Sequence, residues 1–381
     1  MHNNKRTLKV ILLTSLLALG LIVSGCVGMG TAQSGWSGVV AGSQSVYLGS
    51  GAGKLVALNS DNGFYQWQED LEASAAGGGL GCAGASAAVV YSTPVLYGET
   101  VYIGDGGGRL YAFNVNDRQS KNVVLNTGKS GAIIGSPLIA HESVYVGSTD
   151  GNLYAYDAAS LTYRWQYNTG GEIWAAPAVW GNSIFAASFD KKLYSIDAES
   201  GQSNWDEPFE TNGPIIASPL VYGDVVIIAS LDRHVYAVDA ETGELVWSYP
   251  AGDNDENAPK RWLWATPVTG DGKIYIPGMD GKVYVIEASA GGLEGIIEIG
   301  ESVASTPVFA GNRLVLATES GKIYSVDTDN YQKIELRNID TELSSPLGVD
   351  GQIVFVHSVK GNTVYAINGE TGALLWSTSL N

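Results

Sequence analysis

The chain has 381 residues, 45% of them hydrophobic and 16% charged, a balance typical of a folded globular protein. Glycine (49), tyrosine (20) and tryptophan (10) are abundant, and helix-favouring runs are few, so the composition predicts a turn-rich all-β protein. The net charge of −18 disfavours nucleic-acid binding, which requires a basic face, and adhesion of the protein surface to anionic lipid.

The N-terminus reads as an export signal. Lys5, Arg6 and Lys9 precede an uncharged apolar run over 10–23, which is shorter than the about 20 residues of a spanning helix. The junction Val23-Ser24-Gly25-Cys26 resembles a bacterial lipobox, with valine in place of the commoner leucine. The resemblance implies that Cys26 is lipidated and becomes the first residue of the mature chain. An ordinary signal peptide with an incidental cysteine, or an uncleaved anchor, are the alternatives.

Removal of residues 1–25, which hold three basic and no acidic residues, takes the net charge from −18 to −21. We therefore expect membrane attachment only through the lipid on Cys26, with the acidic body held off the bilayer. Cys82 is the one remaining thiol, so an intramolecular disulfide is not expected. It lies in a glycine-rich stretch that reads as a loop, with a redox or pairing role as the alternative.

Two independent markers recur along the chain. The first is a run of aliphatic, tyrosine, small and apolar residues, followed four positions after its start by Asp, Asn or Glu. Its starts are Leu55, Leu110, Leu153, Leu193, Val235, Val283, Ile323 and Val364. The second marker is a proline before an apolar run, at Pro94, Pro137, Pro177, Pro219, Pro267, Pro307 and Pro346, with Val39 in its place in the first copy. Two markers with one period of about 40 residues indicate tandem repeats.

Each repeat reads as four short strands joined by tight turns. In the fifth repeat these are 218–222, 225–229, 235–238 and 245–248. Four antiparallel strands per repeat are typical of a propeller blade, and a closed ring removes exposed sheet edges. The sequence therefore predicts an all-β, eight-bladed β-propeller of four-stranded antiparallel blades. We expect a signal peptide over 1–25, a lipidated tether over 26–35 and a single propeller domain over 36–381.

Five tryptophans fall at equivalent places near the ends of repeats. They are Trp67, Trp165, Trp205, Trp247 and Trp376, and repeats two, six and seven lack them. We interpret them as structural residues that dock one blade on the next, because an indole buries a large area and its N–H finds a carbonyl. Aromatic ligand sites are the alternative.

The segment from Ala237 to Trp247, Ala-Val-Asp-Ala-Glu-Thr-Gly-Glu-Leu-Val-Trp, resembles the pyrroloquinoline-quinone-type propeller repeat. The resemblance covers about residues 36–381. That family contains quinoprotein dehydrogenases and non-enzymatic lipoproteins, among them the eight-bladed lipoprotein of the outer-membrane barrel-assembly machinery. It implies a lipid-anchored scaffold of the cell envelope, on the extracytoplasmic side, with a monomeric body that binds envelope protein partners within a complex.

The sequence lacks the residues that a quinoprotein enzyme would need, so we do not expect an enzyme. The quinoprotein alcohol dehydrogenases use a vicinal cysteine pair that is missing here, and a tricarboxylate quinone needs several cations, whereas 18 basic residues remain after residue 25. The four histidines are dispersed, so neither a cofactor nor a metal is expected. The run 253–257 is rich in oxygen ligands and leaves calcium as an alternative to a solvated insertion. The alternative function is a small-ligand or quinone-binding propeller, which would act either as an enzyme or as a redox or substrate-binding subunit. A third hypothesis is a subunit that binds an extracellular polymer or substrate.

One set of residues suggests a binding site. Three positions before each strand-start proline stand Trp36, Tyr91, Ile134, Trp174, Ile216, Trp264, Ala304 and Leu343. If the inner strands start near one face of the ring, these side chains gather at its central opening. With Arg261 and Trp262 nearby, the aromatic members Trp36, Tyr91, Trp174 and Trp264 form a candidate partner-binding rim, because aromatic and arginine residues are typical of protein-binding hot spots. The alternative is that they plug the channel or pack between inner strands.

Overall fold

The computed structural model describes residues 35–42, 44–72, 88–125, 131–252, 255–358 and 360–380. The chain divides into two units, Met1–Thr31 and Ala32–Asn381. The first unit, which holds the predicted signal peptide and Cys26, lies outside the described residues, as does Cys82. Within the described ranges no helix is long and apolar enough to cross a membrane.

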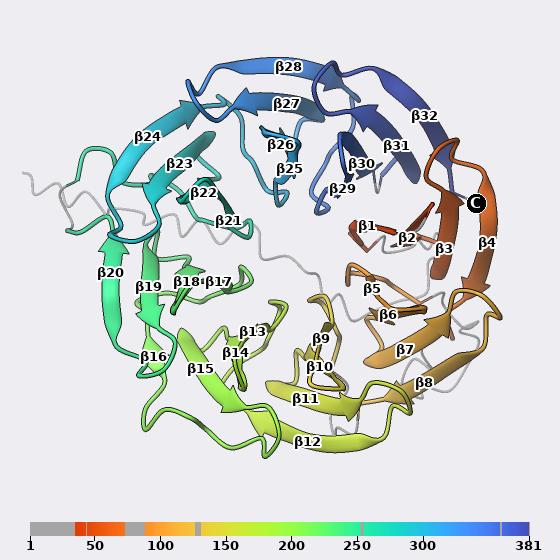
Figure 1. Ribbon diagram of the computed structural model, residues 1–381, viewed down its shortest axis with the longest axis horizontal. Helices are drawn as coiled ribbons and strands as arrows, with labels where there is room; N and C mark the ends of the chain where they lie inside the picture. Colours follow the sequence, from red (N-terminus) through yellow and green to blue (C-terminus); the bar gives the residue numbers. More distant parts are fainter. Residues whose placement is uncertain are drawn as a thin grey trace, which may run out of the picture. The chain divides into compact units, whose positions relative to one another are not determined.

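The second unit is an eight-bladed β-propeller, which confirms the predicted fold (Figure 1). Each blade is a sheet of four strands in chain order, all antiparallel, with the first strand at the centre of the ring and the fourth at its circumference. The first strands are β1 (Val39–Gly42), β5 (Val95–Tyr97), β9 (Leu138–Ala140), β13 (Ala178–Trp180), β17 (Leu220–Tyr222), β21 (Val268–Gly270), β25 (Val308–Ala310) and β29 (Gly348–Asp350). The second strands are β2 (Ser45–Gly49), β6 (Thr100–Gly104), β10 (Ser143–Gly147), β14 (Ser183–Ala187), β18 (Val225–Ala229), β22 (Lys273–Pro277), β26 (Arg313–Ala317) and β30 (Ile353–Ser358).

The third and fourth strands complete the blades. The third strands are β3 (Lys54–Asn59), β7 (Arg109–Asn114), β11 (Asn152–Asp157), β15 (Lys192–Asp197), β19 (Val235–Asp239), β23 (Lys282–Glu287), β27 (Lys322–Asp327) and β31 (Thr363–Asn368). The fourth strands are β4 (Tyr65–Asp70), β8 (Ser120–Val124), β12 (Tyr163–Asn168), β16 (Phe209–Glu210), β20 (Leu245–Tyr249), β24 (Leu293–Glu298), β28 (Lys333–Asn338) and β32 (Leu374–Ser379).

The core lies between the blades. Second and third strands are apolar on both faces because a neighbouring blade covers each face; Val226 on β18 and Val235 on β19 are both fully buried. Eight apolar clusters of the described residues lie between neighbouring blades, one at each junction. Outer strands alternate between exposed and buried side chains, since only one face of each is covered.

The ring closes without strand exchange. The first sheet contains only β1–β4 and the last only β29–β32, so among the described residues no strand of one of these blades pairs with the other blade. An apolar cluster spans this seam, and His357 on β30 places Nδ1 2.8 Å from the carbonyl oxygen of Ser37. His357 stands where other second strands end in small residues such as Gly104 and Ala187, and in the repeat register Gly35 takes the position at which other blades carry an apolar side chain such as Ile133.

The repeat tryptophans lie at the blade junctions. The indole N–H of Trp165 donates to Ala198 O (3.0 Å), that of Trp247 to Ala288 O (3.2 Å), and that of Trp376 to Ser60 O across the seam (2.8 Å). The indole N–H of Trp205 reaches Glu241 O (3.1 Å) from an irregular segment before β16, and Trp67 is half-buried against Tyr47, with ring centroids 5.8 Å apart. Each of the four hydrogen bonds joins one blade to the next.

A glycine of the following blade makes room for the indole. Gly201 has φ +70°, and a Cβ there would lie 2.7 Å from the Trp165 ring. Where the tryptophan is missing, the next blade carries a large residue in place of the glycine. In blade 6 Gly295 takes the tryptophan position, and the Tyr331 ring of blade 7 fills the space, 2.5 Å from where a Gly295 Cβ would lie. In blade 2 Lys121 takes the tryptophan position, because it pairs with Ala112 as Trp165 pairs with Ala155 in blade 3. Blade 3 carries the buried Leu161 at the glycine position.

A second repeated interaction ties the inner turns and was not predicted. An aspartate that follows the second strand accepts a hydrogen bond from the tyrosine of the third strand: Tyr154 to Asp150 (2.8 Å), Tyr236 to Asp232 (2.8 Å) and Tyr284 to Asp280 (2.7 Å). Burial, together with the neighbouring carboxylate, raises the pKa of each of these tyrosines well above its usual range. The sequence carries the signal as an aspartate four residues before the repeat tyrosine. The role of these pairs is structural.

Candidate functional site

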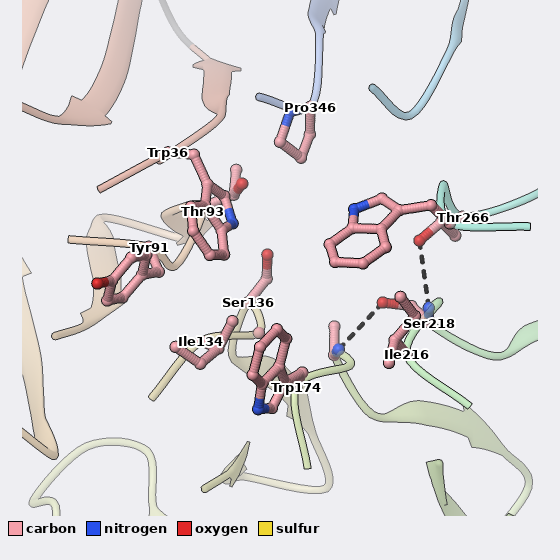
Figure 2. Close-up of a pocket in the computed structure, with 13 residues that line it drawn as sticks. Trp36, Tyr91, Thr93, Ile134, Ser136, Trp174, Ile216, Ser218, Thr266 and Pro346 are labelled. Atoms are coloured by element: carbon pink, nitrogen blue, oxygen red, sulfur yellow. Dashed lines mark hydrogen bonds between the residues drawn. The ribbon is translucent and has the colours of Figure 1, made fainter. Parts of the chain in front are cut away.

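The first strands of the blades position a central funnel. Figure 2 shows Trp36, Tyr91 and Trp174, which come from three blades, around one cavity. The cavity has a volume of about 120 Å³. Its lining consists of Trp36, Tyr91, Thr93, Ile134, Gly135, Ser136, Trp174, Ala176, Ile216, Ser218, Trp264, Thr266 and Pro346. The structure thus brings together four of the six predicted rim residues, Trp36, Tyr91, Trp174 and Trp264.

Ring contacts hold the aromatic side chains in place. The Trp36 and Tyr91 rings lie 4.5 Å apart between centroids, and Trp174 packs on Phe189 at 4.7 Å. The Trp174 indole N–H donates to Glu172 Oε2 at 2.7 Å. Burial raises the pKa of Tyr91, so its phenol remains neutral and able to donate a hydrogen bond. The rings of Trp36, Tyr91 and Trp174 are therefore held by these contacts.

Hydroxyl groups before the prolines link the inner strands below these rings. Backbone N–H groups donate across blade junctions, from Ala176 to Ser218 Oγ (3.0 Å) and from Ser218 to Thr266 Oγ1 (3.2 Å), as Figure 2 shows. Gly38 N donates in the same way to Thr93 Oγ1 (3.1 Å). A residue before proline is held in an extended conformation, which allows these hydrogen bonds between neighbouring blades. The funnel is thus built on a rigid frame.

The expectation that Leu343 faces the funnel was wrong. In six blades the first strand begins directly after the proline, whereas β29 begins at Gly348, two residues after Pro346. The proline of blade 8 is therefore one residue out of register, and Pro346 itself lines the funnel while Leu343 is buried between blades. Ala304 is also buried and does not belong to the lining.

Arg261 and Trp262 lie outside the funnel lining. Both belong to the segment that precedes β21, which is tied to the next turn by a bond from Met279 N to Trp262 O (3.1 Å) and one from Arg261 Nη1 to Met279 O (3.2 Å). Trp262 is 51% exposed. The structure therefore places Arg261 and Trp262 apart from the four aromatic residues that line the funnel.

Comparison with known proteins gives the family. The sequence profile of the family described as outer membrane protein assembly factor BamB matches residues 29–167 and 162–378. The chain belongs to that family. No curated protein sequence matches this chain.

Two solved structures show the same fold. The crystal structure of BamB from Moraxella catarrhalis superimposes with a TM-score of 0.67 at 16% identity, over 86% of this chain and 94% of that one. The computationally designed Ika8 protein superimposes with a TM-score of 0.71 at 18% identity, over 88% of this chain and 96% of that one. At these identities the likeness concerns the fold.

The funnel does not fit a pyrroloquinoline quinone. A flat tricarboxylate needs convergent cations, and none of the 13 lining residues of the described chain carries a charge. A volume of about 120 Å³ is also small beside the about 300–1,000 Å³ of typical small-molecule sites. What the lining offers is aromatic faces and hydroxyls, which suit an apolar or aromatic side chain.

Metal-binding clusters are not found in the described part of the chain, where no three His, Cys, Asp or Glu side chains converge. Residues 253 and 254 of the run 253–257, for which calcium binding was the alternative, lie outside the described residues. Asp255 Oδ1 accepts a hydrogen bond from Asn257 N at 2.8 Å, an ordinary turn contact.

Proposed function

We propose that this protein is a lipid-anchored scaffold of the cell envelope that binds a protein partner at its central funnel during outer-membrane protein assembly. The observation that carries the proposal is the convergence of Trp36, Tyr91, Trp174 and Trp264, from four blades, on one uncharged cavity in a member of the BamB family. Buried aromatic side chains at the centre of an interface dominate binding energies.

The mechanism is presentation on a rigid disc. Packed clusters between neighbouring blades, together with the hydroxyl bonds below the rings, fix the funnel before a partner arrives. A preformed site loses little conformational entropy on binding, so more of the contact energy remains as affinity. The partner is expected to insert an apolar or aromatic side chain. Lipidation of Cys26 would hold this surface near the membrane.

Site-specific photo-crosslinking tests the proposal in the native envelope. A benzophenone amino acid replaces Trp264 in the funnel and, as a matched control, Tyr163, which is 47% exposed on the outer strand β12. We expect position 264 to capture an outer-membrane β-barrel protein or one of its assembly factors, identified by mass spectrometry, and position 163 not to. Equal capture at both positions, or only oxidoreductases at 264, would contradict the proposal.

A double variant separates binding from folding. Trp174→Ala combined with Trp264→Ala removes two of the four rings. Interface hot spots contribute about 2 kcal/mol or more each, which is about 30-fold in affinity per ring, so partner affinity should fall by roughly 1,000-fold if the two effects add. Both side chains are half-buried, so the thermal midpoint should change little. A large loss of stability would instead show that the two rings are part of the core.

A further inference from the structure

The segment that leads into each blade lies on the same face of the ring as the turn between the second and third strands of that blade. Phe189 N donates to Glu172 O (2.9 Å) in blade 4, and Met279 N donates to Trp262 O (3.1 Å) in blade 6. The residues that line the funnel belong to these leading segments. We call this side the funnel face. The turns between first and second strands lie on the opposite side, the far face, because neighbouring strands are antiparallel.

The chain enters blade 1 through the funnel. Gly35 packs against the backbone of Val90, where a Cβ on Gly35 would lie 1.7 Å from the carbonyl oxygen. Trp36 lines the funnel cavity beside Tyr91. The strand β1 that follows lies at the centre of the ring (Figure 1). The point of entry is therefore the centre of the funnel face and not the circumference of the ring.

The reach of the chain between Cys26 and Gly35 is short. Nine residue steps separate the two positions, and a chain extends by at most about 3.3–3.6 Å per residue, or about 32 Å in all. A compact body of about 350 residues has a radius of gyration of about 20 Å, which is a radius of about 26 Å for a sphere. The far face lies beyond that radius and beyond the depth of a five-residue strand, about 17 Å. A lipid on Cys26 can thus enter a bilayer at the funnel face and cannot reach one at the far face.

The funnel face carries exposed cations over blades 4 to 6. In blades 1 and 2 the cation that opens the third strand is paired with a carboxylate, Lys54 with Asp70 (3.6 Å) and Arg109 with Glu72 (3.0 Å). Four exposed cations form no ion pair with any described residue: Lys191, Arg233, Lys260 and Arg261.

Carboxylates lie next to these cations. Asp255 and Glu256 line one cavity with Arg233 and Lys260. A surface that presents both signs of charge suits a headgroup that also carries both, such as the phosphate and ammonium of phosphatidylethanolamine.

Trp262 adds an aromatic side chain to this group. It is 51% exposed and directly follows Lys260 and Arg261. Tryptophan is enriched where proteins meet lipid headgroups, because its ring has an apolar body and a polar N–H. Lysine and arginine near a membrane are attracted to the phosphates of the same layer. An exposed indole beside two cations therefore matches a membrane surface.

We propose that the funnel face is the membrane-facing surface of the propeller and that Lys260, Arg261 and Trp262 contact lipid headgroups. This orientation rests on the lipid at Cys26, which the proposed function includes. The net negative charge of the chain disfavours general adhesion to anionic lipid, whereas the short reach from Cys26 and the local cations select one face. A protein bound in the funnel is consequently one that is present at the membrane surface.

Energy transfer from the protein to the bilayer tests the orientation. The full-length lipoprotein, with Cys82→Ser, is added to vesicles of phosphatidylethanolamine and phosphatidylglycerol that carry an acceptor dye on their headgroups. A donor dye is attached through Asn212→Cys, exposed on the funnel face, or through Tyr97→Cys, 59% exposed on the far face. We expect the donor at 212 to lie closer to the headgroups by about 17 Å or more, the depth of a five-residue strand. Equal distances, or a shorter distance from position 97, would overturn the orientation.

A charge reversal tests the headgroup contact. Lys260→Glu/Arg261→Glu should reduce energy transfer from the donor at 212. The matched control Arg118→Glu/Lys121→Glu makes the same change of charge at exposed positions of blade 2 and should leave the transfer unchanged. Equal transfer in both variants would overturn the contact.

The anchor and the partner are tested separately. A lipoprotein that does not sediment with the vesicles lacks the anchor, and this result would overturn the orientation. Because the vesicles contain no other protein, none of these results depends on the capture of a partner, which the photo-crosslinking measures.

Discussion

Replacement of Trp247 by alanine should cost much of the stability of the propeller. Trp247 is 8% exposed, its ring packs on Gly291, and its N–H donates to Ala288 O of the next blade. About nine-tenths of a tryptophan side chain, or ~200 Å², multiplied by ~25 cal/mol per Å² gives about 4–5 kcal/mol as an upper estimate. The lost hydrogen bond adds about 1 kcal/mol, and partial collapse of the cavity returns part of the sum. We expect a net loss of about 3–5 kcal/mol.

Urea unfolding followed by circular dichroism measures this loss, with Trp262→Ala as the matched control. Trp262 is 51% exposed, so its removal should change the unfolding free energy by less than about 0.5 kcal/mol. Because folded proteins are stable by only about 5–15 kcal/mol, the difference between the two variants will be plain. Equal losses in both variants would refute the argument that blade docking depends on the buried indole.

Three further predictions follow from the junctions and the N-terminus. Burial lowers the pKa of His357 at the seam; the unfolded chain therefore takes up a proton below about pH 6.5 that the folded ring does not, and the unfolding free energy should fall by up to about 1.4 kcal/mol per pH unit below that pH. The slope should flatten in His357→Gln, and an unchanged slope would assign it to other groups. Gly201→Leu should destabilise the blade 3–4 junction, and Trp165→Lys in the same chain should recover part of the loss, with a coupling of about 0.5–3 kcal/mol in a double-mutant cycle; strict additivity would disprove the size relation. Cys26→Ser should release the protein from sedimented membranes, and continued pelleting would count against lipid attachment.

Local patterns were enough to predict the blades. In blade 5 the predicted strands 225–229, 235–238 and 245–248 match β18, β19 and β20 to within one residue. Alternation and turn residues act over a few positions, so they can be read from the chain alone. The aromatic lining of the funnel was also predictable, because a fixed offset from the strand start places equivalent side chains on the same face of the ring.

The fixed offset from the proline gave a wrong prediction in blade 8, where the proline does not directly precede the first strand. Pro346 carries the proline marker but stands one residue before the position that the other prolines occupy, and Leu343 consequently points into the core. Trp205 keeps the spacing of the other tryptophans yet precedes a strand of only two residues, β16. In both cases the residue contacts a neighbouring blade: Leu343 packs between blades 7 and 8, and the Trp205 indole N–H donates to Glu241 O of blade 5.

The sequence by itself determined the repeat length, the number of blades and the strands within each, because those depend on residues close together along the chain. The tertiary structure alone decided how blade 8 meets blade 1 and which residue of the next blade takes the place of the glycine where the indole is missing. The physical reason is that each of these features arises between residues from different blades, up to 320 positions apart in the case of His357 and Ser37. Only closure of the ring brings such residues into contact.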